Sequence, residues 1–201
     1  MADHNQVEPN KRPLTVTIVM LVALIILAGI GGFIWIRDNA GIQVELGEMV
    51  NTPENFTSAV PSKVGYPAPE IALFDLDDTL MSLNDYRGKV VLVNIWTFWC
   101  TACRLDLPVL QSYFEDHQDK NFVVIGIEAG DETEDIVYHA KLFKLTFPIW
   151  QDPYKSAPRA FEMSFLPSSY VIDRNGHIVL TWSGAISREV LEQYVTPLLE
   201  E

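Results

Sequence analysis

The feature that most constrains this chain is a largely apolar run, Val90 to Ile95, which leads within five residues to a pair of cysteines, Cys100 and Cys103. A run of this length, rich in β-branched residues, is typical of a buried strand in a parallel sheet. Apolar residues then recur at helical spacing; they are Cys103, Leu107, Leu110 and Phe114. The pattern predicts a strand, a turn that contains Cys100, and a helix whose first turn contains Cys103.

This placement of the cysteines favours redox chemistry. A thiolate is the reactive form of cysteine, and a helix N-terminus stabilises negative charge. We therefore expect Cys100 to attack a target disulfide and Cys103, the shielded partner, to resolve the mixed disulfide. The alternatives are a structural disulfide and half of a zinc site. The chain has only two cysteines, which excludes a four-cysteine zinc site, and closing a four-residue loop stabilises a fold by only about 1.9 kcal/mol.

A long uncharged segment, residues 14–36, precedes the rest of the chain. As a helix it would extend about 34 Å, enough for a hydrocarbon core of about 30 Å. A cleaved signal peptide has a shorter apolar region, of about 7–15 residues, so we favour an uncleaved single-pass anchor. Lys11 and Arg12 precede the segment and Arg37 follows it, which predicts a cytoplasmic N-terminus, residues 1–13. The catalytic part would then lie outside the cytoplasmic membrane, where disulfides persist.

The remaining chain divides into a linker, residues 37–63, and one globular domain, residues 64–201. Residues 38–201 contain 11 Lys and Arg against 25 Asp and Glu. This acidic excess argues against nucleic acid as a partner and against docking on anionic lipid. Its simplest interpretation is solubility.

Within the domain, alternating and helical patterns follow one another along the chain. Asn175-Gly176 between two apolar runs is a strong hairpin signal, and Pro108 should kink the helix that follows the cysteines. The predicted strands are 71–76, 80–83, 90–95, 122–127, 169–172 and 178–182; the predicted helices are 132–143, 156–161 and 187–199. This order predicts an α/β fold with a mixed sheet covered on both faces.

Several motifs together resemble a known family. They are the W-C-x-x-C motif at 99–103 with Pro108 five residues on, Gly65–Pro69, Asp85–Trp96 and Phe165–Gly176. The chain is similar to membrane-anchored thiol-disulfide oxidoreductases of the TlpA/ResA type, including the CcmG-like members. The resemblance spans residues 64–201 and implies a thioredoxin-like fold with a redox-active disulfide, Cys100–Cys103.

The resemblance also implies roles for other residues. Pro167 matches a proline whose preceding peptide bond is cis and which lies against the active-site sulfur. Asn94 stands where thioredoxins proper carry a buried aspartate, so another acid should exchange a proton with the cysteines. Asp131 is the preferred candidate, and Glu128 is the alternative.

Two further positions, Trp99 and Leu166, should line the groove that receives the substrate. The bulk of Leu166, directly before Pro167, is expected to restrict the substrates accepted. The pair between the cysteines, Thr101-Ala102, departs from the family's more usual residue–Pro pair and leaves the reduction potential open.

The resemblance implies an extracytoplasmic, membrane-tethered reductase of exported proteins, with apocytochrome c among the candidate substrates. Electrons would come from a membrane thiol-disulfide donor, and no cofactor or metal is expected beyond the disulfide. Two alternatives stay open. A peroxiredoxin-like peroxidase shares Pro69 and Asp85–Lys89, although the W-C-x-x-C motif argues against it. A copper-binding assembly factor would need a third ligand, and neither His139 nor His177 lies in a recognisable metal motif.

Overall fold

The computed structural model describes residues 57–200. The predicted cytoplasmic segment 1–13, the predicted anchor 14–36 and most of the predicted linker lie outside these residues. Between residues 57 and 200, no helix combines the length and the apolar character that crossing a bilayer requires.

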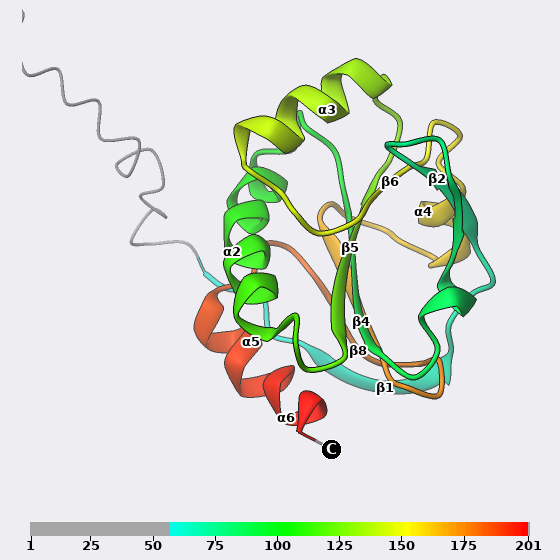
Figure 1. Cartoon of the computed structure of the whole chain (residues 1–201). Helices are drawn as coiled ribbons and strands as arrows, with labels where there is room; N and C mark the ends of the chain where they lie inside the picture. Colours follow the sequence, from blue (N-terminus) through cyan, green and yellow to red (C-terminus); the bar gives the residue numbers. More distant parts are fainter. Residues whose placement is uncertain (1–56, 201) are drawn as a thin grey trace, which may run out of the picture. The chain divides into compact units, whose positions relative to one another are not determined.

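A mixed sheet of eight strands forms the centre of the described part (Figure 1). Its order is β1-β8-β7-β4-β5-β6-β2-β3. The β4–β5 and β5–β6 pairs are parallel, and all other neighbours are antiparallel. The strands are β1 Ser62–Pro67, β2 Ala72–Asp75, β3 Leu80–Ser82, β4 Val90–Trp96, β5 Phe122–Glu128, β6 Ile149–Gln151, β7 Ser168–Ile172 and β8 His177–Ser183.

Helices cover both faces of the sheet, as predicted (Figure 1). They are the 3₁₀ helix η2 Leu83–Tyr86, α2 Thr101–His117, α3 Thr133–Leu142, α4 Ser156–Ala160, α5 Arg188–Tyr194 and α6 Thr196–Leu199. On one face, α2, α3 and α5 contribute Leu107, Ile136 and Leu191 to a single apolar cluster. On the other face, the much shorter α4 contributes Ala157 to a second cluster.

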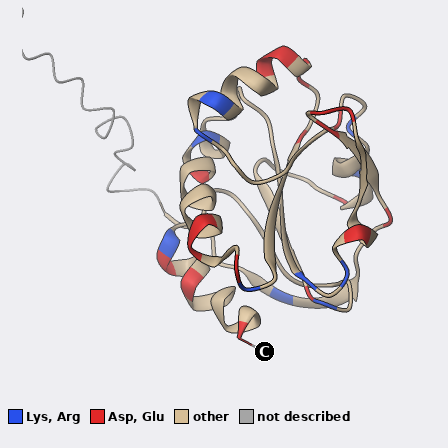
Figure 2. Ribbon diagram, viewed as in Figure 1, with Lys and Arg blue, Asp and Glu red and all other residues tan. Residues whose placement is uncertain are grey.

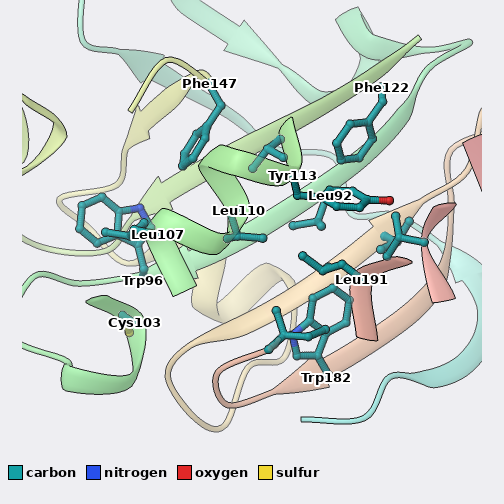
Figure 3. Packing of buried hydrophobic residues seen from close by; sticks show 14 of the residues in the cluster. Leu92, Trp96, Cys103, Leu107, Leu110, Tyr113, Phe122, Phe147, Trp182 and Leu191 are labelled. Atoms are coloured by element: carbon teal, nitrogen blue, oxygen red, sulfur yellow. The ribbon is translucent and has the colours of Figure 1, made fainter. Parts of the chain in front are cut away.

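The two central strands, β4 and β5, are buried along their whole length. Because both of their faces are covered, these strands are almost continuously apolar instead of alternating. Figure 3 shows Leu92 and Trp96 of β4 packed with Leu107 and Leu110 of α2. This packing fixes the end of β4 against the start of α2, which is where the cysteines lie.

The predicted turn at Asn175-Gly176 is confirmed, and it joins β7 to β8. The Asp173 carboxylate accepts the backbone N–H groups of Asn175 at 2.9 Å and of His177 at 2.8 Å. Gly176 has a φ of +84°, a conformation that side chains disfavour. The glycine is therefore required by the turn itself.

Most predicted boundaries shift by one or two residues, and two predictions differ more from the structure. The single helix predicted over 187–199 is wrong, because α5 ends at Tyr194 and α6 begins at Thr196. Pro197 has no N–H to donate to the carbonyl four residues earlier, and its ring crowds that carbonyl. The folded part also begins before Val64, since β1 starts at Ser62 and the Ala59 N–H donates to the Ala185 carbonyl at 2.8 Å.

Candidate active site

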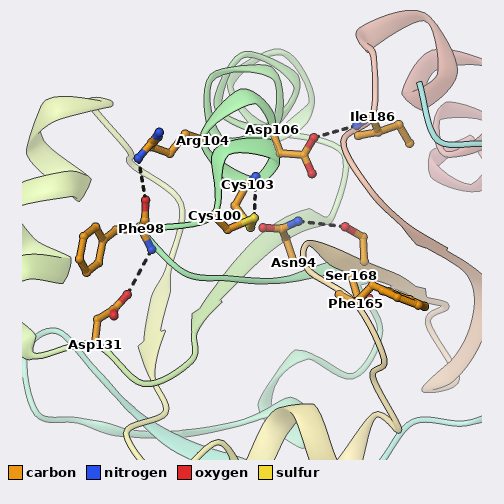
Figure 4. Close-up of a disulfide and its surroundings, with 11 residues drawn as sticks. Asn94, Phe98, Cys100, Cys103, Arg104, Asp106, Asp131, Phe165, Ser168 and Ile186 are labelled. Carbon is orange, nitrogen blue, oxygen red and sulfur yellow. Dashed lines mark hydrogen bonds between the residues drawn. A yellow bond between two sulfur atoms is a disulfide. The ribbon is translucent and has the colours of Figure 1, made fainter. Parts of the chain in front are cut away.

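The two cysteines lie where the end of β4 meets the start of α2, and they form a disulfide (Figure 4). Cys100 is the N-cap residue of α2, and its Sγ accepts the backbone N–H of Cys103 at 3.1 Å. Cys100 retains 9% of its exposure, whereas Cys103 retains none. The cysteine that keeps some exposure is therefore also the one whose sulfur accepts an N–H at the start of the helix, a position that favours negative charge.

The segment before Cys100 is held from two sides. The Phe98 N–H donates to the Asp131 carboxylate at 3.1 Å, and the Phe98 carbonyl accepts Nη1 of Arg104 at 3.1 Å (Figure 4). The Phe98 ring also stacks on His139 of α3, with 4.9 Å between the ring centroids. These contacts fix the backbone that leads into Cys100.

The peptide bond between Leu166 and Pro167 is cis, as the resemblance implies. Pro167 directly precedes β7, whose Ser168 pairs with Ile95 of β4, so the proline lies level with the end of β4. Leu166 packs against the cluster that contains both cysteines. Two large aromatic side chains around this site are open to solvent, Trp99 at 60% and Phe165 at 71% exposure.

A buried carboxyl that the sequence analysis missed, Asp106, lies one helical turn after Cys103. Asp106 has no exposure, and its Oδ1 accepts the Ile186 N–H at 2.7 Å (Figure 4). Its Oδ2 has no hydrogen-bond partner among residues 57–200. Burial raises the pKa of Asp106 to about 8, against the opposing hydrogen bond from the Ile186 N–H. The sequence did offer a signal for Asp106, since this acid lies three residues after Cys103 and so falls on the buried face of the predicted helix.

Asn94 itself is completely buried, and its Nδ2 donates to Ser169 of β7 at 2.9 Å. Asn94 and Asp106 are therefore two buried polar side chains on β4 and α2, the elements that meet at the cysteines. An asparagine cannot titrate, so of these two groups only the carboxyl of Asp106 can exchange a proton with a thiol.

The two acids predicted after β5 have different surroundings. The preferred one, Asp131, uses its carboxylate to accept the Phe98 N–H. The buried one is the alternative, Glu128, which has 1% exposure and whose Oε2 accepts the Asp131 N–H at 2.9 Å. Burial, followed by the neighbouring Asp131, raises the pKa of Glu128 to about 9. Hydrogen bonds thus connect Glu128 to Asp131, and Asp131 to the backbone N–H of Phe98, two residues before Cys100.

The described residues offer no group of three or more His, Cys, Asp or Glu side chains that could hold a metal ion. His139 stacks on Phe98, and its Nδ1 lies 2.8 Å from the Asp135 carbonyl. His177 lies beside Asp173 in the β7–β8 turn. Neither histidine forms such a group with the two cysteines.

A disulfide at a helix start can exchange with other disulfides through the sulfur that is less deeply buried, which here belongs to Cys100. With a cis proline on the neighbouring strand, this is the arrangement of thioredoxin-like thiol-disulfide oxidoreductases. The chain belongs to the AhpC/TSA family, whose model matches residues 64–181.

Relatives agree with this class. The thiol-disulfide oxidoreductase ResA of Geobacillus thermodenitrificans (strain NG80-2) is 30% identical over 140 residues, which cover 70% of this chain and 80% of that protein. Among solved structures, a Chlorobium tepidum protein described as thiol:disulfide interchange protein DsbE is 29% identical with a TM-score of 0.64, covering 69% and 98% of the two chains. A thiol:disulfide interchange protein from Bacteroides sp. is 26% identical with a TM-score of 0.61, covering 69% and 91%. This protein is a thiol-disulfide oxidoreductase, and the predicted resemblance is confirmed at the level of the thioredoxin-like family.

Proposed function

We propose that this protein is an extracytoplasmic reductase, tethered to the membrane by residues 14–36, which reduces disulfides in exported proteins. Apocytochrome c before haem attachment is one candidate substrate. The observation that carries the proposal is the asymmetry of the cysteine pair: Cys100, the N-cap residue of α2, keeps 9% of its exposure, while Cys103 keeps none. A pair arranged in this way can attack with one sulfur and resolve with the other.

The reaction starts from the reduced pair. The Cys100 thiolate attacks one sulfur of the substrate disulfide, so that a Cys100–substrate bond forms and the other substrate sulfur leaves as a thiolate and takes up a proton. Cys103, as a thiolate, then attacks Cys100. The Cys100–Cys103 bond forms and the second substrate sulfur leaves and is protonated. The substrate gains two electrons and the enzyme loses two.

The second step needs a base, because Cys103 is buried and must lose its proton before it attacks. Asp106, with a pKa raised to about 8, is ionised in a fraction of molecules near neutral pH and can take that proton. Burial makes this carboxyl a stronger base than an exposed aspartate, which is the property that general base catalysis requires. Asp106 therefore serves the resolving cysteine.

The cycle closes when a donor returns two electrons to the disulfide. Outside the cytoplasm a reductant needs a dedicated supply, because the thiol pools of the cytosol are absent. We propose a membrane thiol-disulfide protein as this donor. The membrane tether would keep the domain within its reach.

Single cysteine variants test the proposed chemistry. Cys100→Ser should abolish insulin reduction, since the attacking sulfur is lost. Cys103→Ser should form mixed disulfides that persist, because the resolving sulfur is lost, and proteins trapped in this way from the outer face of the membrane would name the substrates. Alkylation of the reduced protein at neutral pH provides the check. Faster labelling of Cys103 than of Cys100 would reverse the assignment.

A reporter fused after Glu201 tests the location. Alkaline phosphatase, which needs disulfides to fold, should be active in this fusion and sediment with membranes. Activity only from a reporter that functions in the cytoplasm would contradict the proposed orientation. Recovery of a chain that begins after residue 28 would show that the N-terminal segment is cleaved.

Peroxide reduction is the second candidate, because Pro69 and Asp85–Lys89 are residues that peroxiredoxins share. Stopped-flow oxidation of the reduced protein separates the two functions. We expect a disulfide peptide to oxidise the Cys100–Cys103 pair much faster than hydrogen peroxide at equal concentration. The reverse order would favour the peroxidase.

A further inference from the structure

A cavity of about 660 Å³ lies on the sheet face opposite α2, away from the helix that carries the disulfide. Its floor consists of residues of β7 and β8. Its walls come from the segment after α4 and from the end of β1. Aromatic and hydroxyl-bearing side chains line much of it, among them Tyr66, Phe161, Phe165, Tyr170, Thr181 and Ser183.

This end of the sheet is open because α4 is short. The helix has five residues and packs its Ala157 into the second cluster. It leaves Thr181 partly exposed and Ser183 exposed on β8. Tyr66 on the edge strand β1 keeps 43% of its exposure. The cavity is therefore reachable from solvent.

The cavity borders the turn that contains the cis bond. Phe165 and Ser168 line the cavity and lie directly before and after Leu166–Pro167. Ser168 Oγ lies 2.7 Å from the Phe165 carbonyl, to which it donates, and 2.9 Å from Ser183 Oγ. Leu166 packs against both the cluster with the cysteines and the cluster under the cavity. Figure 4 shows Phe165 and Ser168 on the side of the disulfide opposite Phe98.

The lining suits an uncharged or basic polypeptide segment with an aromatic side chain. The rings of Phe161 and Tyr170 lie 4.6 Å apart, and Phe165 adds a third, largely exposed ring. Hydroxyl groups of Thr181 and Ser183 can bond to a peptide backbone. Glu162 is the charged residue of the lining.

The volume of the cavity and the charge of the protein further restrict which segment can bind there. The volume lies within the range of sites that hold ligands larger than one side chain, about 300–1,000 Å³. Acidic residues outnumber basic ones over the ribbon (Figure 2), which disfavours an acidic segment. Aromatic partners gain from offset or edge contacts with the rings already present.

We propose that this cavity receives an extended segment of the unfolded substrate polypeptide, carrying an aromatic side chain and no excess of acid, while the substrate cysteine is bonded to Cys100. The inference rests on the proposed function and adds a determinant of substrate choice away from the sulfurs. The segment would leave the cysteines past Leu166 and enter the cavity between Phe165 and Ser183.

The test uses the full chain, purified in detergent and reduced, with two probes. One is bis(2-hydroxyethyl) disulfide, which is too small to reach from Cys100 into the cavity. The other is a twelve-residue peptide dimer joined by a disulfide, with tryptophans near the cysteine. Thr181→Arg fills the cavity floor, and Thr79→Arg, at an exposed threonine in the β2–β3 turn, is the matched control. Thr181→Arg should slow peptide reduction about tenfold and leave reduction of the small disulfide within twofold, and the control should change neither.

Equal peptide rates in Thr181→Arg and wild type would overturn the proposal while leaving the redox function intact. If Thr181→Arg slows the reduction of both probes, the wild-type protein provides the test. Its rate of reduction of the tryptophan peptide is compared with its rate for a version in which serine replaces the tryptophans. At least a fivefold preference for tryptophan supports the proposal, and equal rates overturn it. A wild type that reduces neither probe would instead refute the proposed function.

A competition experiment addresses other occupants. The tryptophan peptide with its cysteine replaced by serine should inhibit reduction of the peptide dimer but not of the small disulfide. Absence of competition, together with a dimer of this protein that Thr181→Arg dissociates, would assign the cavity to a second copy of the chain and overturn the proposal.

Discussion

Two buried carboxyls flank the redox disulfide, and their surroundings differ in an instructive way. Asp106 lies on α2, one turn from Cys103, and both it and Asn94 on β4 are completely buried. Glu128 lies at the end of β5, and its contact with the active site passes through Asp131 to the backbone of Phe98. Burial raises the pKa of both, to about 8 and about 9.

The comparison separates two tasks that a single acid could have combined. The proton acceptor that we propose for the buried thiol, Asp106, lies one helical turn after Cys103 on α2. A positioning acid has to hold the backbone before Cys100, which the pair of Glu128 and Asp131 does through hydrogen bonds. A raised pKa alone therefore does not identify the group that takes part in proton transfer.

The largest expected effect is on how the free energy of unfolding changes with pH. Each carboxyl binds its proton more tightly in the folded than in the unfolded protein, so stability should fall as pH rises from about 4 to the raised pKa. At about 1.4 kcal/mol per pKa unit, the fall for Asp106 amounts to several kcal/mol, and the fall for Glu128 has the same sign. Asp106→Asn and Glu128→Gln should each flatten this fall. Urea unfolding of an oxidised fragment, residues 50–201, at pH 5 and pH 8.5 measures the fall in unfolding free energy between the two pH values. A fall equal to that of wild type in both variants would contradict the burial of both groups.

The next effect distinguishes the two acids in catalysis. Asp106→Asn keeps an oxygen for the Ile186 N–H but cannot take a proton, so single-turnover insulin reduction at pH 7 should slow roughly 10²-fold. The mixed disulfide on Cys100 should accumulate, because the resolving step is the one that slows. Glu128→Gln, the control, should stay within about threefold of wild type. A larger loss in Glu128→Gln than in Asp106→Asn would exchange the two roles.

The smallest effect concerns the backbone before Cys100. Asp131→Ala removes the acceptor of the Phe98 N–H and should cost about 1–2 kcal/mol of unfolding free energy, with a reduction rate a few times lower. Asp131→Asn retains an oxygen and should lose less of both. Denaturant midpoints and rates of the two variants provide the measurement. If the alanine variant matches wild type, the hydrogen bond does not position Cys100.

Much of the molecule follows from local patterns in the sequence. The run from Val90 to Ile95, the C-x-x-C spacing and the Asn175-Gly176 turn each specify a structure through neighbours within a few residues. The resemblance adds the cis bond before Pro167. Strand and helix periodicities and turn chemistry are properties of short segments, and for this reason the mixed sheet and the disulfide at the helix start could be predicted.

The tertiary structure alone decided which acids are buried. Asp106 is completely buried, and its hydrogen-bond donor is the N–H of Ile186, 80 residues away in the sequence. Glu128 and Asp131 are three residues apart, yet the turn between them buries one and directs the other to Phe98. Desolvation depends on every atom packed around a group, and those atoms come from distant segments whose arrangement no local pattern contains.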